Sequence, residues 1–291
     1  MIRRKLSRFL PLGLKLTISR VIDGVADVQL LGLRGAVDYW RIMREYREGH
    51  RIDGLWRIHV KGCLGGVAGR YGTSDLAVFR QIFVHQEYKW ANELCGAAAG
   101  GLIIDCGANV GYTTLYLLRL FAKVRVVAVE PDASNFEMLE LNLQRWQGRA
   151  RAINAGVWSR RTRLVCGNFG EIDLQHWGRQ VRECDADTPD SIDAITIGGV
   201  LAESGYERIS LLKVDIEGAE VVVFGDGSEE WLGRTDAIGI ELHDKTSFGP
   251  ATEVFHEAIR SENFSLKNSG ELTIAIRRQS SGSAQEGSSC T

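Results

Sequence analysis

Short apolar runs alternate with helix-like segments over most of the chain after Gly101. Between most of these runs apolar residues recur at helical spacing, as in Phe136, Leu139, Leu143 and Trp146. Such alternation predicts an α/β fold in which helices cover both faces of a mostly parallel sheet. The predicted strands are Leu102–Asp105, Val124–Val129, Ile153–Trp158, Ile209–Ile216 and Ala237–Leu242.

The ends of the chain depart from this alternation. Phe264–Lys267 and Leu272–Ile276 flank a turn at Asn268-Ser269-Gly270, which predicts an antiparallel C-terminal hairpin. Val25–Tyr46 has the spacing of one or two helices. Trp56–Val60 is strand-like, and a helix-like stretch runs from Asp75 to about Cys95. We therefore divide the chain into a basic, helical N-terminal extension (1–50), a lead-in segment (51–100), a main domain (101–278) and a tail expected to be disordered (279–291).

The helix predicted after Val124–Val129 carries a start signal of its own. Ser134 and Glu137 have the spacing of a capping box, in which a hydroxyl and a carboxylate bond free backbone N–H groups. We therefore expect this pair to cap the helix.

Charge is spread unevenly along the 291 residues. The net charge of −2 gives no large basic field, so the whole chain is not expected to bind nucleic acid. Residues 1–60 nevertheless hold 12 Lys/Arg against 6 Asp/Glu, and every charge before Asp23 is positive. This basic segment predicts either contact with an anionic membrane surface or a solvated arm. No apolar run approaches the ~20 residues that span a bilayer.

The six cysteines form no Cys-x-x-Cys pair, and no His cluster accompanies them. Neither a structural metal site nor a disulfide framework is therefore predicted. Cys106 lies in the loop described next, where a reactive thiol is a liability in an oxidising compartment. We expect a cytoplasmic protein without a signal peptide.

A glycine-containing loop, Asp105-Cys106-Gly107-Ala108-Asn109-Val110-Gly111, follows one predicted strand and precedes a helix. Gly107 and Gly111 let the backbone turn sharply and approach a ligand. Glu130 ends the next strand, where a carboxylate can accept hydrogen bonds from both hydroxyls of a ribose. The pattern predicts a nucleoside site; the alternative is a tight turn without a function.

Two cofactors fit such a site. Asn109 stands where the dinucleotide fingerprint needs its second glycine, which argues against an NAD-dependent oxidoreductase. Asp105 suits a cationic ligand, because a carboxylate can fix the amine of a methionine moiety. We therefore expect S-adenosylmethionine, bound by Asp105, Gly107, Asn109, Gly111 and Glu130, with Tyr112, Asp132 and Asp215 completing the set of cofactor-binding residues.

The chain resembles the FkbM family of S-adenosylmethionine-dependent methyltransferases over about residues 70–278. The run LLKVDIEGAE at 211–220 is the most specific match. The other matching stretches are SDLAVFRQIF with Glu87-Tyr88, IIDCGANVGYTT, VAVEPDASNFEML and IGIELH. The resemblance implies a Rossmann-like class I fold with a seven-stranded sheet whose last two strands form the hairpin. It also implies methyl transfer to a hydroxyl of a sugar or another small natural product. Cys106 replaces a more usual aliphatic residue, and residues 1–50 match nothing in the family.

Methyl transfer to an alcohol needs a group that removes the proton, near the cofactor loop. Asp215 and Glu217 follow one strand, and Glu241 and His243 end the next. If the strands continue that far, each pair shares a face, and the four groups converge. We take Asp215 or His243 as the general base and Glu217 as the group that orients the acceptor.

Other roles stay open for these residues. Glu217 can instead cap the following helix, and His243 can be structural. The carboxylates can also hold Mg²⁺. Aromatic residues in the lead-in segment, with Gln81, Tyr88 and Asp75, are candidates for acceptor contacts. A non-catalytic nucleoside-binding module is the remaining alternative.

Overall fold

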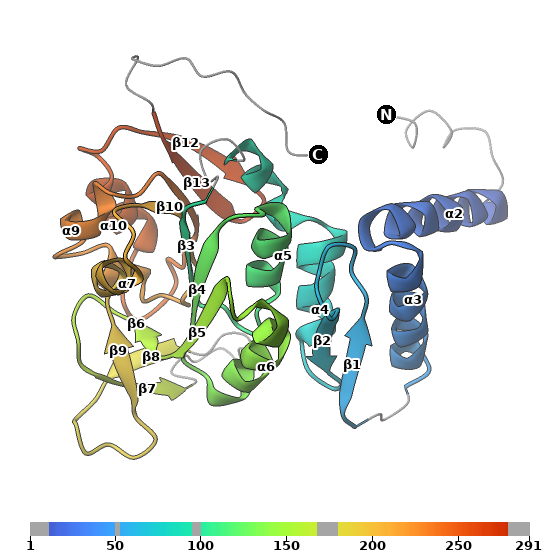
Figure 1. Ribbon diagram of the computed structural model, residues 1–291, viewed down its shortest axis with the longest axis horizontal. Helices are drawn as coiled ribbons and strands as arrows, with labels where there is room; N and C mark the ends of the chain where they lie inside the picture. The colour runs from blue at the N-terminus through green and yellow to red at the C-terminus, as the bar shows by residue number, and fades with distance from the viewer. Residues whose placement is uncertain (1–11, 50–52, 95–99, 168–179, 279–291) are drawn as a thin grey trace.

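The computed structural model describes residues 12–49, 53–94, 100–167 and 180–278 (Figure 1). Its centre is a seven-stranded sheet of order β12-β13-β11-β10-β3-β4-β5. The α/β fold with a mostly parallel sheet is thereby confirmed. The strands are β3 (Leu102–Cys106), β4 (Arg125–Glu130), β5 (Ala150–Asn154), β10 (Ile209–Val214), β11 (Ala237–Glu241), β12 (Phe264–Ser269) and β13 (Leu272–Arg277).

Strand directions place the ligand crevice. β3 pairs in parallel with both β4 and β10, and the strand order runs outward in both directions from this point. Open α/β sheets bind ligands at the carboxyl ends of strands at such a switch point. β13 is antiparallel to β11 and β12, which confirms the predicted hairpin.

Alternate residues of each strand enter different cores. Ile103 of β3 packs on the side of α5 (Tyr112–Leu120) and α6 (Ala133–Leu143). Leu102 and Ile104 pack on the opposite side. The helices there are α7 (Ile197–Ser204), α8 (Glu220–Val223), α9 (Glu229–Leu232) and α10 (Ala251–Ala258). Both faces of the sheet are therefore covered, as the near-continuous apolar strands require.

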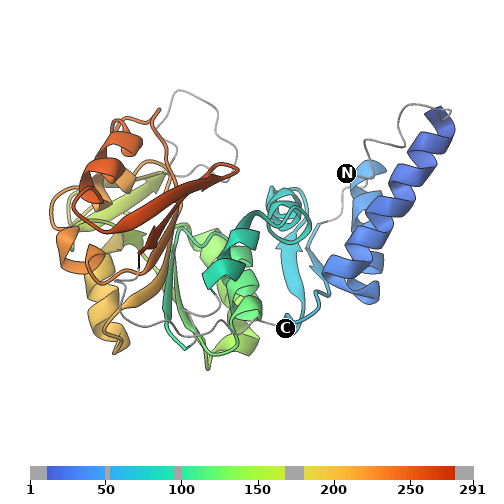
Figure 2. The same cartoon turned by 90° about the horizontal axis from the view of Figure 1, so that it is seen from above.

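The N-terminal segments pack against the α5 side of the sheet (Figure 2). Tyr39, Trp56 and Phe79 share one hydrophobic core with Tyr112 of α5. The region 25–46, where one or two helices were predicted, contains parts of two helices. No helix in the described chain is long and apolar enough to cross a membrane. The elements are α2 (Leu12–Leu31), α3 (Leu33–Arg47), β1 (Leu55–Ile58), β2 (Val67–Arg70), α4 (Asp75–Phe79), a π-helical turn (Arg80–Val84) and a 3₁₀ segment (Glu87–Leu94).

A second, four-stranded sheet of order β6-β9-β7-β8 was not predicted. The apolar run Ile153–Trp158 looks like one strand, but the chain leaves β5 after Asn154 and joins this other sheet at Gly156. An apolar run cannot tell which sheet each residue will enter. The strands are β6 (Gly156–Val157), β7 (Arg163–Gly167), β8 (Gln180–Glu183) and β9 (Ile192–Ile195).

The predicted capping box of α6 is wrong. The N-cap is Asp132, whose carboxylate accepts the Asn135 N–H at 2.9 Å. Ser134 instead accepts a hydrogen bond from Arg70, and Glu137 is exposed. A residue from a distant strand therefore takes the hydroxyl that the local pattern assigned to the cap. The predicted disordered tail (279–291) lies outside the described residues.

Candidate functional site

A cleft opens at the carboxyl ends of β3, β4 and β10. It is lined by Gly107, Asn109, Val129, Glu130, Pro131, Asn135, Ala155, Gly156, Val157, Val181, Asp215, Ile216 and Glu217. Four predicted cofactor residues are in this wall: Gly107, Asn109, Glu130 and Asp215. The other four are absent from it: Asp105, Gly111, Tyr112 and Asp132.

Backbone geometry explains the two loop glycines. Gly107 has φ +76°, and a Cβ there would meet the Asp215 carbonyl oxygen at 1.8 Å. Gly111 is the left-handed N-cap of α5, and its Cβ would lie 2.7 Å from Leu139 Cδ1. No larger residue fits either position without a backbone shift. Gly111 therefore shapes the loop from behind, whereas Gly107 borders the cleft itself.

Glu130 holds the loop from the tip of β4. Its Oε2 accepts the Asn109 N–H at 2.8 Å, and its Oε1 accepts the Asp132 N–H at 3.0 Å. Burial raises the pKa of Glu130 to about 7, although these two N–H groups act to lower it. Each oxygen keeps a further lone pair, so the carboxylate can also accept from two hydroxyls of a ligand in the cleft. This arrangement fits the ribose contact predicted from the sequence.

A network from the lead-in segment supports the same wall. Asn135 lines the cleft, and its side-chain oxygen accepts from Arg70 Nη2 at 2.8 Å. Asp75, 2% exposed, holds the Arg70 guanidinium through both carboxylate oxygens at 2.9 and 3.0 Å. Asp75 is thus engaged in the interior and is not free to contact an acceptor. Arg70 was missed in the sequence, because its partners on α6 are distant in the chain.

A buried cation lies beneath the loop. Lys213 Nζ lies 3.2 Å from Asp105 Oδ1 and 3.7 Å from Asp215 Oδ2, and it donates to the Gly107 carbonyl oxygen at 2.6 Å. Burial lowers the pKa of Lys213, but the charges of Asp105 and Asp215 raise it above its ordinary value. Asp105 is fully buried, so its carboxylate holds Lys213 behind the cleft wall. Tyr112 is also interior, where its hydroxyl donates to the Ala68 carbonyl oxygen.

The structure brings the predicted catalytic residues together. One ligand atom each of Asp215, Glu241 and His243 lies within 4.8 Å of the others. His243 Nε2 is 3.6 Å from both Glu217 and Glu241, and its Nδ1 is 3.0 Å from Glu220 Oε1. In the part of the chain that the structure describes, Asp215, Glu241 and His243 are also the residues grouped closely enough for a metal ion.

Glu217 lies near His243, but not because a strand continues to residue 217, as was predicted. β10 ends at Val214, and Glu217 has φ +55°, so a turn rather than strand alternation directs its side chain. The N-cap of α8 is Ala219 with no side-chain cap, so Glu217 does not cap that helix. Glu220 instead accepts the Ile216 N–H at 3.1 Å. Glu220 was missed, because its complete burial depends on tertiary packing.

The group is crowded with negative charge. Burial and the charge of Asp215 raise the pKa of both Glu217 and Glu241 to about 7. Burial lowers the pKa of His243, but the hydrogen bond and charge of Glu220, with the charge of Glu217, raise it to about 9. Near neutral pH the histidine is therefore mostly an imidazolium, and the two glutamates change protonation readily.

One more carboxylate faces this group. Glu87, from the 3₁₀ segment, accepts from Gln81 Nε2 at 3.0 Å. Burial and the charge of Asp215 raise its pKa, although the bond from Gln81 acts to lower it. The ring of Tyr88 is buried beside it. Gln81, Glu87 and Tyr88 are absent from the cleft wall, so they adjoin the acidic group from outside the cleft.

Comparison with known proteins gives one family and several relatives. The methyltransferase FkbM domain matches residues 105–266, more than half of the chain. The AMB antimetabolite synthetase AmbE of Pseudomonas aeruginosa is 26% identical over 236 residues, which are 69% of this chain but 11% of that protein. Methyltransferase sdnD of Sordaria araneosa is 25% identical over 62% of this chain and 79% of its own length.

Two of the solved structures that match this chain contain S-adenosylhomocysteine. The O-methyltransferase from Bacillus cereus in complex with S-adenosylhomocysteine has a TM-score of 0.38 and 13% identity, over 67% of this chain and 81% of that one. TrmK of M. capricolum, also with S-adenosylhomocysteine, has a TM-score of 0.37 and 9% identity, over 68% and 72%.

Proposed function

The chain belongs to the FkbM family of methyltransferases, and we propose that it transfers the methyl group of S-adenosylmethionine to a hydroxyl of a sugar or another small natural product. One observation carries this proposal. The cleft with Glu130 in its wall shares Asp215 with the group that also contains Glu241 and His243. Cofactor and proton acceptor would then lie on the two sides of one carboxylate.

The cleft fits the cofactor in shape and in charge. Glu130 would accept from the ribose hydroxyls, and the space beside Gly107 would let the ligand approach the backbone. When bound, S-adenosylmethionine supplies an electrophilic methyl group on a cationic sulfonium. Asp215 and Glu217, both in the wall, would place negative charge near that cation.

Proton removal is the second requirement of transfer to a hydroxyl. We keep Asp215, Glu217 and His243 as the catalytic group and add Glu241 as the general base. Its pKa of about 7 matches neutral pH, whereas the pKa of about 9 makes His243 a poor proton acceptor there. His243, as an imidazolium, would hold Glu217 and Glu241 in place. Glu217 would orient the acceptor.

Small polar molecules suit the outer side of this group. Glu87 and Gln81 offer hydrogen bonds to a polyhydroxylated acceptor. The name of AmbE refers to an antimetabolite, which agrees with an acceptor from small-molecule biosynthesis. This chain spans only a ninth of that protein's length, so its full activity is not carried over.

Two calorimetric titrations test the cofactor. S-adenosylhomocysteine should bind the purified protein, and NAD should not; the reverse result would make the chain an oxidoreductase instead. A panel of sugars, glycosides and polyketide alcohols is then offered with S-adenosylmethionine carrying a labelled methyl group. Product with the label on oxygen is expected. Label on nitrogen or carbon would contradict hydroxyl transfer, and binding without any methylated product from a broad panel would favour a non-catalytic module.

A further inference from the structure

Helix α3 has two faces with different environments. Its inner face buries Ala36, Tyr39 and Ile42 against the body of the protein. Gly35 lies so close that a Cβ would meet the His59 carbonyl oxygen at 1.9 Å. This packing fixes the orientation of α3 on the protein. It therefore also determines which side chains of α3 point to solvent.

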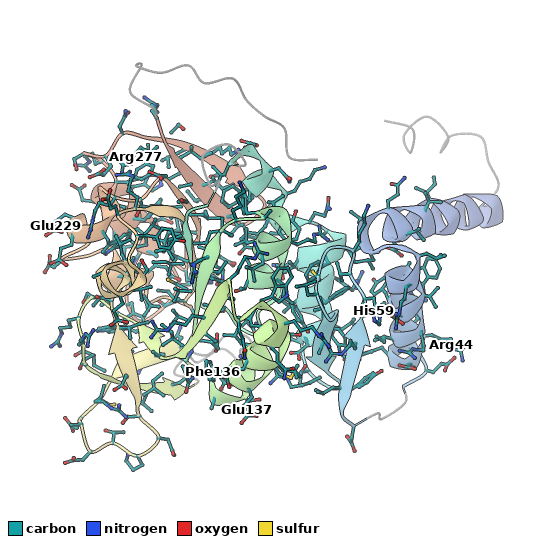
Figure 3. All side chains as sticks on the ribbon, in the orientation of Figure 1. Arg44, His59, Phe136, Glu137, Glu229 and Arg277 are labelled. Carbon is teal, nitrogen blue, oxygen red and sulfur yellow. The ribbon has the colours of Figure 1, made fainter. Side chains whose placement is uncertain are left out.

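The outer face of α3 is both apolar and cationic. Leu33, Val37 and Trp40 follow one helical stripe and are 70%, 53% and 41% exposed. Exposed arginines stand on the same side of the helix, and Figure 3 shows Arg44 projecting away from the sheet. The arginines are Arg34, Arg41, Arg44 and Arg47.

The carboxylates of α3 do little to neutralise these arginines. Asp38 is half-buried and accepts from the His59 N–H and ring Nδ1 at 3.2 and 2.7 Å. Glu45 accepts from the Tyr71 hydroxyl at 2.7 Å. Both acids are therefore directed at the body of the protein. Glu48, at the C-cap, pairs with Arg44 at 3.1 Å. The outer face keeps a positive excess.

Helix α2 extends the same surface. Ile22 and Val25 are exposed, and Trp40 donates its indole N–H to Asp27 of α2 at 2.8 Å. Among the described residues, five of the eight large apolar side chains that are exposed lie on α2 and α3. Exposed apolar side chains in the described chain are thus concentrated on these two helices, beside the arginines of α3.

We propose that this outer face of α3 docks on the surface of an anionic lipid bilayer. Apolar side chains enter the headgroup boundary, and arginines reach the lipid phosphates while their stems stay in apolar surroundings. A second copy of the chain fits poorly, because a symmetric pairing would set arginines against arginines. The apolar stripe with Trp40 distinguishes lipid from a purely acidic partner.

Vesicle sedimentation tests the proposal with the full chain. The protein should pellet with vesicles of phosphatidylcholine and phosphatidylglycerol and remain in solution with pure phosphatidylcholine. Replacing Arg41 by Gln should weaken partitioning about fivefold, and the pair R41Q/R44Q about twentyfold. Val37→Asp, which removes apolar area and adds a negative charge, should weaken it at least as much as the single arginine change.

Matched controls lie elsewhere on the surface. Arg260→Gln removes an arginine that is 75% exposed and pairs with Glu257 of α10, whereas Arg44 is 78% exposed and pairs with Glu48. Leu64→Asp changes an apolar residue as exposed as Val37. Both should partition like the parent, and every variant should keep its affinity for S-adenosylhomocysteine.

Three results would overturn the proposal. The first is equal recovery with the two vesicle types. The second is α3 variants that partition like the parent. The third is a dimer in analytical ultracentrifugation that Val37→Asp dissociates, which would assign this face to self-association.

Discussion

The cofactor wall and the catalytic group adjoin at Asp215 but differ in how their polar atoms are satisfied. Glu130 in the wall, and Asp132 two residues after it in the chain, are buried and accept backbone N–H groups at 2.8 to 3.0 Å. In the catalytic group, His243 Nε2 faces two carboxylates at 3.6 Å, too far for hydrogen bonds. Glu217 also adopts a backbone conformation that favours glycine.

This difference indicates two kinds of preorganisation. Both carboxylate oxygens of Glu130 already have backbone donors without a ligand. In the catalytic group, burial and the charge of Asp215 raise the pKa of Glu217 and Glu241 to about 7. Hydrogen bonds therefore hold Glu130 in a fixed position, whereas the glutamates of the catalytic group can gain or lose a proton near neutral pH. Four predictions test this contrast, from the largest expected effect to the smallest.

Glu241→Gln should reduce turnover about 10²- to 10⁴-fold, because the proton acceptor is lost. Affinity for S-adenosylhomocysteine should not change, since Glu241 is absent from the cleft wall. In the parent enzyme the base must be ionised, so the rate should rise with pH until about 7 and then level off. Rates on the acceptor found by screening give the profile. A rise centred near pH 9 would assign the base to His243 instead.

Lys213→Met should lower the free energy of unfolding by about 3–5 kcal/mol, because Asp105 would remain buried and unpaired. Urea unfolding followed by fluorescence measures the loss. Adding Asp105→Asn should recover a large part of it, since the unpaired charge is removed. A double variant no more stable than the single one would contradict a role for this buried pair in linking wall and catalytic group.

Glu130→Ala should raise the dissociation constant for S-adenosylhomocysteine roughly 10- to 100-fold, through lost charged hydrogen bonds. Calorimetry measures this constant. Glu137→Ala is the matched control, because Glu137 is an exposed glutamate on α6 (Figure 3). Unchanged affinity in Glu130→Ala, with the protein folded, would remove the ribose assignment.

Arg70→Ala should raise the same dissociation constant only about three- to tenfold, because Arg70 acts through Asn135. Maximal turnover should hold, since the catalytic group is untouched. Arg70→Lys should fall between parent and alanine, because an ammonium cannot form the forked pair with Asp75. Arg57→Ala, in the same hairpin, is the control. A larger fall in turnover than in affinity would mean that the two regions are not separable.

Local sequence patterns were enough to predict much of this fold. The alternation of apolar runs predicted the parallel sheet and its hairpin, because burial on both faces leaves an apolar strand of recognisable length. Four of the eight residues predicted to bind the cofactor line the cleft: Gly107, Asn109, Glu130 and Asp215. Gly107 and Glu130 occupy positions that chain geometry alone defines, at the ends of consecutive strands.

Contacts between distant segments decided the rest. The sequence placed Asp105 among the ligand contacts, but Lys213 and Thr114 hold it in the interior. The sequence assigned Ser134 to a local cap, but Arg70 takes its hydroxyl. Arg70 and Glu220 gave no signal at all, because burial and long-range pairing exist only once the chain is folded. The sequence alone thus determined the fold class, a mostly parallel sheet with a C-terminal hairpin. It also determined the residues at the carboxyl ends of β3 and β4 that line the cleft. Tertiary packing decided which charges face the cleft, since a charge is stable only beside the partners that folding brings to it.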